Sequence, residues 1–260
     1  DDHPMFRYGL RAVLAAARLR ETDMSAALLR VTAETDPAAR LAALSRALGR
    51  AGLTGLAAPE AGGAPGFGTL RGLAPPRSVP GPLVTVIVPA FRAEATLGVS
   101  LRSLADQTWA ELEVIVVDDA SPDGTAAVAA AFALRDPRFR LLAQPVNGGA
   151  YLARNRGLAA ASGAFVTVQD ADDWAHPERI AVQMAELRRR GAAFNLTDWA
   201  RATADLRFFG PRQPSPNLVG PNFSSLLFRR EIVARCGVWD AVRISGDREY
   251  VARLERLLGL

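Results

Sequence analysis

The stretch Ala164-Phe-Val-Thr-Val-Gln-Asp-Ala-Asp-Asp-Trp174 decides the fold. Its first part, Ala164–Val168, is a short apolar run rich in β-branched residues, which predicts a strand buried on both faces. Three carboxylates, Asp170, Asp172 and Asp173, follow at the C-terminal end of that strand. If the extended geometry continues, the side chains of Asp170 and Asp172 point to the same side of the chain.

Three carboxylates this close repel one another, so they stay ionised together only when a cation or hydrogen-bond donors compensate. A divalent cation with oxygen ligands would compensate them. Mg²⁺ or Mn²⁺ suits the site better than zinc because no cluster of Cys or His accompanies the carboxylates. The alternative is a solvated acidic turn that caps a helix beginning near Pro177. The motif alone does not decide between the two.

Strands and helices alternate on the N-terminal side of this stretch. The predicted strands are Leu83–Val88, Leu112–Val117, Phe139–Leu142 and Ala164–Gln169, and the predicted helices between them are Glu94–Gln107, Asp123–Arg135 and Gly149–Ala161. This order predicts an α/β fold with a mostly parallel sheet between helices. Ligands of such sheets bind beyond the carboxyl ends of the strands. Three groups of residues converge there: Pro89-Ala90-Phe91, Asp118-Asp119, and Asp170 to Asp173.

The glycine patterns of two common nucleotide-binding folds are absent from the sequence. No Gly-x-Gly-x-x-Gly follows the first strand, and no P-loop pattern occurs, which argues against a dinucleotide fold and a P-loop NTPase. Phosphates would then be held by a metal ion and by arginine. Asn147-Gly148-Gly149 precedes a helix that carries Arg154 and Arg156, and this helix could supply both donors and charge to a diphosphate. The alternative for these arginines is a solvated helix face.

Composition narrows the class of protein further. The 260 residues are 49% hydrophobic with a net charge of +4, and all the basic residues are scattered Arg, so no nucleic-acid footprint is indicated. No apolar run approaches the roughly 18 residues of a membrane span. The single Cys236 fits a reducing compartment, and its simplest reading is a buried apolar residue. The chain lacks both a signal peptide and an initiator Met, as expected of an excerpt from a longer protein.

Three units are predicted along the chain. Residues 1–54 form an all-α segment, with helices over Met5–Arg20 and Asp23–Val31 and a third that starts at Pro37 behind the N-cap Asp36. Residues 55–82 are rich in Gly and Pro and predict an irregular linker. Residues 83–260 form the α/β domain, and truncation of this domain at its C-terminus is left open. Within it, short strands are predicted at 192–197 and 223–228, with a mobile loop over 201–217 between them.

Five motifs, in order along the chain, resemble family 2 inverting glycosyltransferases. The motifs are Val84-Thr-Val-Ile-Val-Pro-Ala-Phe91, Ser103-Leu-Ala-Asp-Gln-Thr108, Glu113-Val-Ile-Val-Val-Asp-Asp-Ala-Ser-Pro-Asp-Gly-Thr125, Asn147-Gly-Gly-Ala-Tyr-Leu-Ala-Arg-Asn-Arg-Gly157 and Gln169-Asp-Ala-Asp-Asp-Trp174. The resemblance runs from about residue 83 to residue 190. The resemblance implies the GT-A nucleotide-sugar transferase fold.

The same resemblance implies roles for individual residues. Pro89, Ala90 and Phe91 would line a nucleoside pocket in which Asp119 holds the base, usually uracil, while Asp118 supports the turn. Arg154 would lie near the diphosphate. Asp170 and Asp172 would lie close to the donor sugar, and Asp172 and Asp173 would be the metal-diphosphate carboxylates for Mn²⁺ or Mg²⁺. Which of the three carboxylates touches the metal directly is left open.

The catalytic base is expected near the C-terminus. Ile244-Ser-Gly-Asp-Arg-Glu-Tyr250 resembles the acidic motif that carries the base in this family, which makes Asp247 the first candidate and Glu249 the second. Gly246 stands where the family more commonly has Glu, and the alternative for Asp247 is a helix N-cap. His176 is interpreted as a polar residue at a helix start, with metal ligation as the weaker alternative.

The expected activity is transfer of a sugar from a nucleotide-sugar donor, favoured as a UDP-sugar, to a hydroxyl of a glycan or lipid-linked acceptor. The expected setting is bacterial surface polysaccharide or glycoconjugate synthesis in the cytoplasm. Peripheral association with the inner face of the membrane is left open, as is oligomerisation through the N-terminal helices. Two rivals remain. A sugar-nucleotide pyrophosphorylase would carry a Gly- and Lys-rich phosphate loop that this chain lacks. A catalytically silent nucleotide-sugar-binding or scaffold module would bind nucleotide without turnover.

Overall fold

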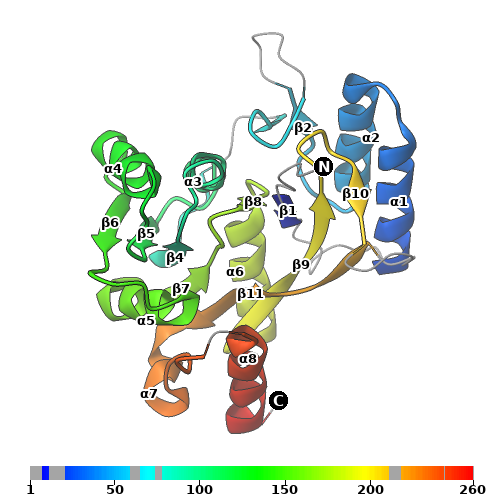
Figure 1. Cartoon of the computed structure of the whole chain (residues 1–260). Coiled ribbons are helices and arrows are strands. Elements are labelled where there is room, and N and C mark those ends of the chain that lie inside the picture. Colours follow the sequence, from blue (N-terminus) through cyan, green and yellow to red (C-terminus); the bar gives the residue numbers. More distant parts are fainter. Residues whose placement is uncertain are drawn as a thin grey trace.

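A computed structural model describes residues 8–11, 21–58, 65–73, 78–210, 218–242 and 244–259. Within these ranges, one large sheet forms the centre of the molecule (Figure 1). Its strands are β1 Tyr8–Arg11, β4 Val84–Ala90, β5 Leu112–Asp118, β6 Phe139–Ala143, β7 Phe165–Val168, β8 Asp173–Ala175, β9 Phe194–Ala202, β10 Phe208–Phe209 and β11 Val219–Arg229. The strand order is β6-β5-β4-β7-β11-β9-β1-β8, and β10 pairs with β9.

The half of the sheet from β6 to β7 is parallel, as the alternation of strands and helices predicts. β11 then runs antiparallel to both β7 and β9. β4 does not stop before Pro89 as predicted but continues through Pro89 and Ala90. Along a strand, the backbone N–H and C=O groups of successive residues point alternately to the two neighbouring strands. Those of Ile87 point toward β7, since its carbonyl accepts from Gln169 N. Pro89 faces the same side beyond the end of β7, so its missing N–H removes no ladder bond.

Helices cover both faces of this sheet. α3 Leu97–Ala105, α4 Thr125–Arg135 and α6 Arg179–Arg190 contribute to one apolar core, while α5 Ala150–Ala160, α7 Val233–Cys236 and α8 Gly246–Leu258 contribute to the other. The 3₁₀ turn η1 Arg230–Ile232 leads into α7. Cys236 is buried, which agrees with its interpretation as a buried apolar residue. None of the helices in the described ranges has the length and apolar character needed to cross a membrane.

The N-terminal part of the chain contains the two helices α1 Glu21–Ala33 and α2 Pro37–Arg50. Asp36 caps α2 by accepting a hydrogen bond from Ala39 N, as predicted. The helix predicted over Met5–Arg20 is wrong in its described part, because Tyr8–Arg11 forms β1 between β8 and β9. Two neighbouring strands satisfy both edges of this segment, which outweighs the helical spacing of its apolar residues.

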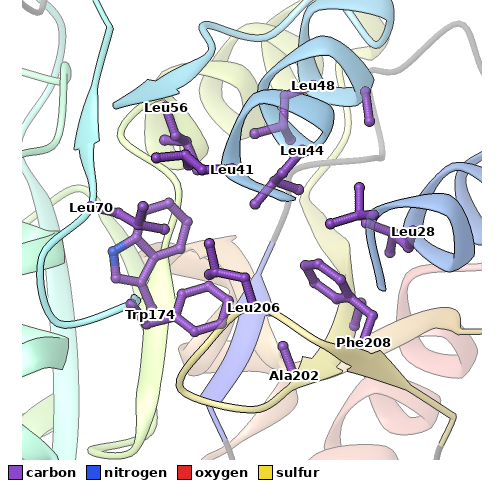
Figure 2. Close-up of a cluster of buried hydrophobic side chains, with 14 of the residues drawn as sticks. Leu28, Leu41, Leu44, Leu48, Leu56, Leu70, Trp174, Ala202, Leu206 and Phe208 are labelled. Carbon is purple, nitrogen blue, oxygen red and sulfur yellow. The ribbon is translucent and has the colours of Figure 1, made fainter. Parts of the chain in front are cut away.

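A third apolar core joins the N-terminal helices to the sheet (Figure 2). Leu28 and Leu44 from α1 and α2 are buried in the same cluster as Trp174 and Phe208. The cluster therefore draws on residues from both sides of the predicted linker, and the division of the chain into domains stays a prediction.

Residues 55–82, predicted as an irregular linker, contain a short hairpin of β2 Leu56–Ala57 and β3 Arg71–Gly72. Phe67 and Leu70 are buried in the third core. These apolar residues stand singly among Gly and Pro, so no periodicity indicates that they pack. Residues 59–64 and 74–77 lie outside the described part of the stretch.

The loop predicted over 201–217 is also shorter than expected. β9 extends to Ala202 and β10 follows, while 211–217 lies outside the described residues. Fully buried Arg40 of α2 holds the turn between these strands, since its guanidinium donates to the Asp205 carbonyl and carboxylate. This contact comes from α2, which is remote in the sequence. The Pro- and Arg-rich composition of residues 201–217 therefore could not predict it.

Candidate active site

A first cavity of about 300 Å³ lies at the carboxyl ends of β4 and β5. Pro89, Ala90, Phe91 and Asp119, the predicted nucleoside-binding residues, line it together. The remaining lining residues are Asn147, Gly149 and Ala150. The structure thus brings the predicted set to one cavity, and the nucleoside role of each residue stays a prediction.

Asp119 fixes one wall of this cavity. Its buried carboxylate accepts hydrogen bonds from Gly148 N at 2.8 Å, Gly149 N at 2.7 Å and the side chain of Gln144. Gly149 has a φ of +86°, a conformation that favours glycine, and it directs its N–H at Asp119 just before α5 begins. Asp118 accepts from Ser121 N, in keeping with its predicted support of the turn.

The loop that carries the three neighbouring carboxylates is a turn rather than an extension of β7. Asp173 N donates to the Asp170 carbonyl at 3.1 Å, which closes the turn. The extended geometry therefore does not continue beyond β7, and the alignment of Asp170 and Asp172 that depended on it does not apply. Asp172 is exposed, Asp170 is partly exposed, and Asp173 is buried at the start of β8. Even so, all three side chains line one cavity.

This second cavity has a volume of about 580 Å³ and receives residues from five elements and the carboxylate loop. Its lining residues are Tyr151, Asp170, Asp172, Asp173, Trp199, Arg201, Pro221, Asn222, Phe223, Ser224, Ser245, Asp247 and Arg248. The first turn of α5 reaches both cavities, because Ala150 lines the first and Tyr151 lines the second. The two cavities therefore both border the start of α5, and together with the carboxylate loop they form the candidate site.

Arg154 of α5 connects two of the predicted carboxylates. Its Nη2 donates to Asp170 Oδ1 at 2.8 Å, its Nη1 donates to Asp247 Oδ1, and its guanidinium lies 5.0 Å from the Tyr151 ring centroid. The side chain is 3% exposed. Burial alone would lower the pKa of this guanidinium, but the two carboxylates outweigh burial and raise the pKa. Arg154 therefore stays charged and holds both acids in place.

Asp247, the predicted base, lies inside the first turn of α8. The N-cap position belongs to Ser245, which has a φ of 63°, so the alternative reading of Asp247 as an N-cap does not hold. Tyr151 Oη donates to Asp247 Oδ2 at 3.4 Å, and burial followed by the charge of Asp247 raises the pKa of that phenol. The second candidate base, Glu249, instead pairs with Arg253 and does not line the cavity.

A buried polar network under the carboxylate loop was not anticipated from the sequence. Gln169 Nε2 donates to Ser100 Oγ at 2.8 Å and to the Asp173 carbonyl at 3.2 Å. Arg179, fully buried at the start of α6, donates to Gln169 Oε1 and Thr167 Oγ1. The only available signal was a Gln that directly follows an apolar strand. The network gives the loop a rigid support.

His176 lies away from both cavities. Its Nε2 is 2.9 Å from the Thr54 carbonyl, and its Nδ1 accepts from Glu178 N, while the Glu178 carboxylate accepts from Thr54 N. This supports the interpretation as a polar residue before a helix, although α6 begins at Arg179 rather than at Pro177. His176 thus joins the carboxylate loop to the N-terminal part of the chain.

The stability of the protein is expected to fall by about 1 to 2 kcal/mol between pH 7 and pH 5 because of His176. Burial lowers the pKa of this imidazole from its usual 6.5. The unfolded state therefore binds a proton first as the pH drops, and stability present above pH 6.5 is lost below it. Urea unfolding at several pH values measures the slope, and His176→Gln should flatten it. Equal slopes in both proteins would contradict the assignment.

Comparisons with solved structures identify the fold. TarS residues 1–349 from S. aureus, in complex with UDP-GlcNAc, matches with a TM-score of 0.52 and 21% identity over 66% of this chain and 52% of that chain. The mannosyltransferase PcManGT from Pyrobaculum calidifontis, in complex with GDP-Man and Mn²⁺, matches with a TM-score of 0.52 and 21% identity over 89% of this chain and 63% of that chain. The fold is therefore that of GT-A glycosyltransferases, as the motifs imply.

The family follows from the sequence itself. The model of the family described as glycosyl transferase family 2 matches residues 85–244, and the chain belongs to this family. Among its relatives, the succinoglycan biosynthesis protein ExoO of Rhizobium meliloti is 36% identical over 58% of this chain and 44% of the relative. The UDP-Glc:alpha-D-GlcNAc-diphosphoundecaprenol beta-1,3-glucosyltransferase WfgD of Escherichia coli is 35% identical over 43% of this chain and 44% of the relative. The chain spans less than half the length of these relatives.

Proposed function

We propose that this chain transfers a sugar from a nucleotide-sugar, favoured as a UDP-sugar, to an acceptor hydroxyl with inversion at the anomeric carbon. The proposed setting is polysaccharide or glycoconjugate synthesis in the cytoplasm, with a glycan or a lipid-linked acceptor. The observation that carries the proposal is the joint position of the two cavities. Ala150 and Tyr151 connect a cavity lined by the predicted nucleoside residues to one lined by four carboxylates. A nucleotide in the first cavity would direct its sugar into the second.

A divalent cation suits the oxygen donors of the carboxylate loop. Within the described ranges, no group of three or more His, Cys, Asp or Glu side chains is arranged to hold a metal ion. The protein would then contribute the carboxylates of Asp172 and Asp173, and the diphosphate of the donor would complete the coordination, a pattern usual for Mg²⁺. Once bound, Mn²⁺ or Mg²⁺ would neutralise charge on the departing diphosphate.

Asp247 is the proposed general base. Its carboxylate would take the proton of the acceptor hydroxyl, and the oxygen would attack the anomeric carbon from the face opposite the nucleotide. Arg154 and Tyr151 orient this carboxylate from α5. Ser224 donates to Asp170 Oδ2 at 2.9 Å, so Asp170 is oriented from β11 as well as by Arg154. Both acids are thus held before substrate binds.

Nucleotide binding gives the first test. UDP at about 100 times its dissociation constant should stabilise the protein by roughly 2.7 kcal/mol, and this gain should require both Mn²⁺ and Asp172. Thermal unfolding with a panel of nucleoside diphosphates, with and without Mn²⁺, measures it for the wild type and Asp172→Ala. Asp23→Ala, an exposed acid on α1, is the matched control.

Stabilisation by UDP that requires Mn²⁺ and Asp172 would justify testing UDP-sugars as donors, with release of UDP as the signal. Stabilisation by another nucleotide would replace UDP as the donor, and no stabilisation by any nucleotide would contradict the proposal. Binding without turnover on any sugar or acceptor would favour the catalytically silent module.

A further inference from the structure

One wall of the second cavity carries two arginines stacked on aromatic rings. The guanidinium carbon of Arg248 lies 5.2 Å from the Phe223 ring centroid, and that of Arg201 lies 4.7 Å from the Trp199 ring centroid. All four residues line the cavity. They come from β9, β11 and the first turn of α8, whereas the metal-binding carboxylates proposed above come from the loop before β8. Positive charge therefore borders a cavity that four aspartates also line.

Arg248 is not used to hold the fold. It is exposed, and among the described residues it forms no ion pair and no hydrogen bond with a protein group, only its stack on Phe223. Arg253 on the same helix is different, because it pairs with Asp240 and Glu249 and donates to the Val238 carbonyl. Stacking fixes the plane of a guanidinium and leaves the N–H groups at its edge able to bind an anion.

The position of these arginines points to the acceptor rather than to the nucleotide. The first cavity lies at β4 and β5, and in the sheet β7 and β11 separate β4 from β9. Arg248 is one residue from the proposed base, Asp247. A neutral acceptor needs no cation at this wall. An anionic acceptor does, because Asp170, Asp172, Asp173 and Asp247 would otherwise repel it.

We propose that the acceptor sugar carries an anionic group, either a carboxylate or a phosphate ester, and that Arg248 binds it with support from Arg201. This inference rests on the proposed function because it takes the second cavity as the acceptor site. Arg–carboxylate and Arg–phosphate contacts are charge-assisted and directional, so they also fix the orientation of the sugar toward Asp247.

Binding of simple sugars tests the proposal directly. Glucose, glucuronate and glucose 1-phosphate are titrated into the protein, with and without UDP and Mn²⁺, and binding is followed by ligand-observed NMR. We expect at least one of the two anions to bind about tenfold more tightly than glucose. Arg248→Gln should abolish this preference and Arg248→Lys should retain part of it. Arg256→Gln, which removes an exposed arginine at the other end of α8, should change nothing.

Each result decides the proposal. A preference for glucuronate identifies an acidic sugar, and a preference for glucose 1-phosphate identifies a phosphorylated one. No preference, or one that survives in Arg248→Gln, overturns the anion site. Weaker UDP binding in Arg248→Gln would assign the arginine to the donor and overturn it as well. If no nucleoside diphosphate binds but the Arg248-dependent preference persists, the anion site stands and the proposed transferase activity fails.

Discussion

Replacement of Asp247 by Asn is expected to lower the rate of sugar transfer by about 10²- to 10⁴-fold and to leave nucleotide affinity unchanged. The amide keeps the shape of the side chain but cannot accept the proton of the acceptor hydroxyl. Asp247 lines the second cavity, not the first, so nucleotide binding should be preserved. The rate is measured as release of nucleoside diphosphate with the donor found by the thermal screen, and the affinity by calorimetry.

Asp240→Asn provides the matched control for this change. Like Asp247, Asp240 pairs with an arginine (here Arg253 of α8), but it is largely exposed and lies outside both cavities. It should transfer sugar at the wild-type rate. Transfer by Asp247→Asn at a rate near that of the wild type would remove Asp247 from the role of base, and the other acids of the second cavity would then be tested.

Replacement of Arg154 by Met is expected to destabilise the protein by about 1 to 3 kcal/mol and to abolish transfer. Met fills a similar volume, so the loss is electrostatic. Without the buried guanidinium, the partly exposed carboxylates of Asp170 and Asp247 lose their shared partner. Urea unfolding measures the loss of stability.

A double variant separates stability from chemistry. Arg154→Met combined with Asp247→Asn removes one of the two acids that lose Arg154 in the single variant, so it should recover part of the lost stability while staying inactive. Strictly additive losses in the two single variants and the double variant would show that the two residues are not coupled. Full activity of Arg154→Met would show that neither acid depends on it.

The parallel half of the fold could be predicted because its information is local. Continuous β-branched runs such as Leu112–Val117, separated by helices with apolar periodicity, specify strands and their order with few alternatives. β1, the β2–β3 hairpin and β10 could not be predicted. All of these strands are only two to four residues long. β1 pairs with strands far away in the sequence, β2 is bonded by Ser45 of α2, and β10 is bonded by Thr32 of α1.

The candidate site shows the same division. The predicted residues Asp170, Asp172, Asp173 and Asp247 line one cavity because each stands at the end of a strand or the start of a helix. The link that Arg154 makes between Asp170 and Asp247 could not be predicted, since it depends on how α8 packs against α5. The supporting roles of Gln169 and Arg179 were missed for a similar reason, because their hydrogen bonds depend on how α3 and α6 pack below the carboxylate loop.

The shared core of the N-terminal helices and the sheet has a consequence for synthesis on the ribosome. Leu28 and Leu44 leave the ribosome well before Phe208 and Leu218, which complete their core. Domains tend to fold from the N-terminus as they emerge, but these helices must wait for most of the chain while their apolar stripes remain exposed. We therefore expect the apolar stripes of these two helices to stay exposed until the residues around Phe208 and Leu218 have been synthesised.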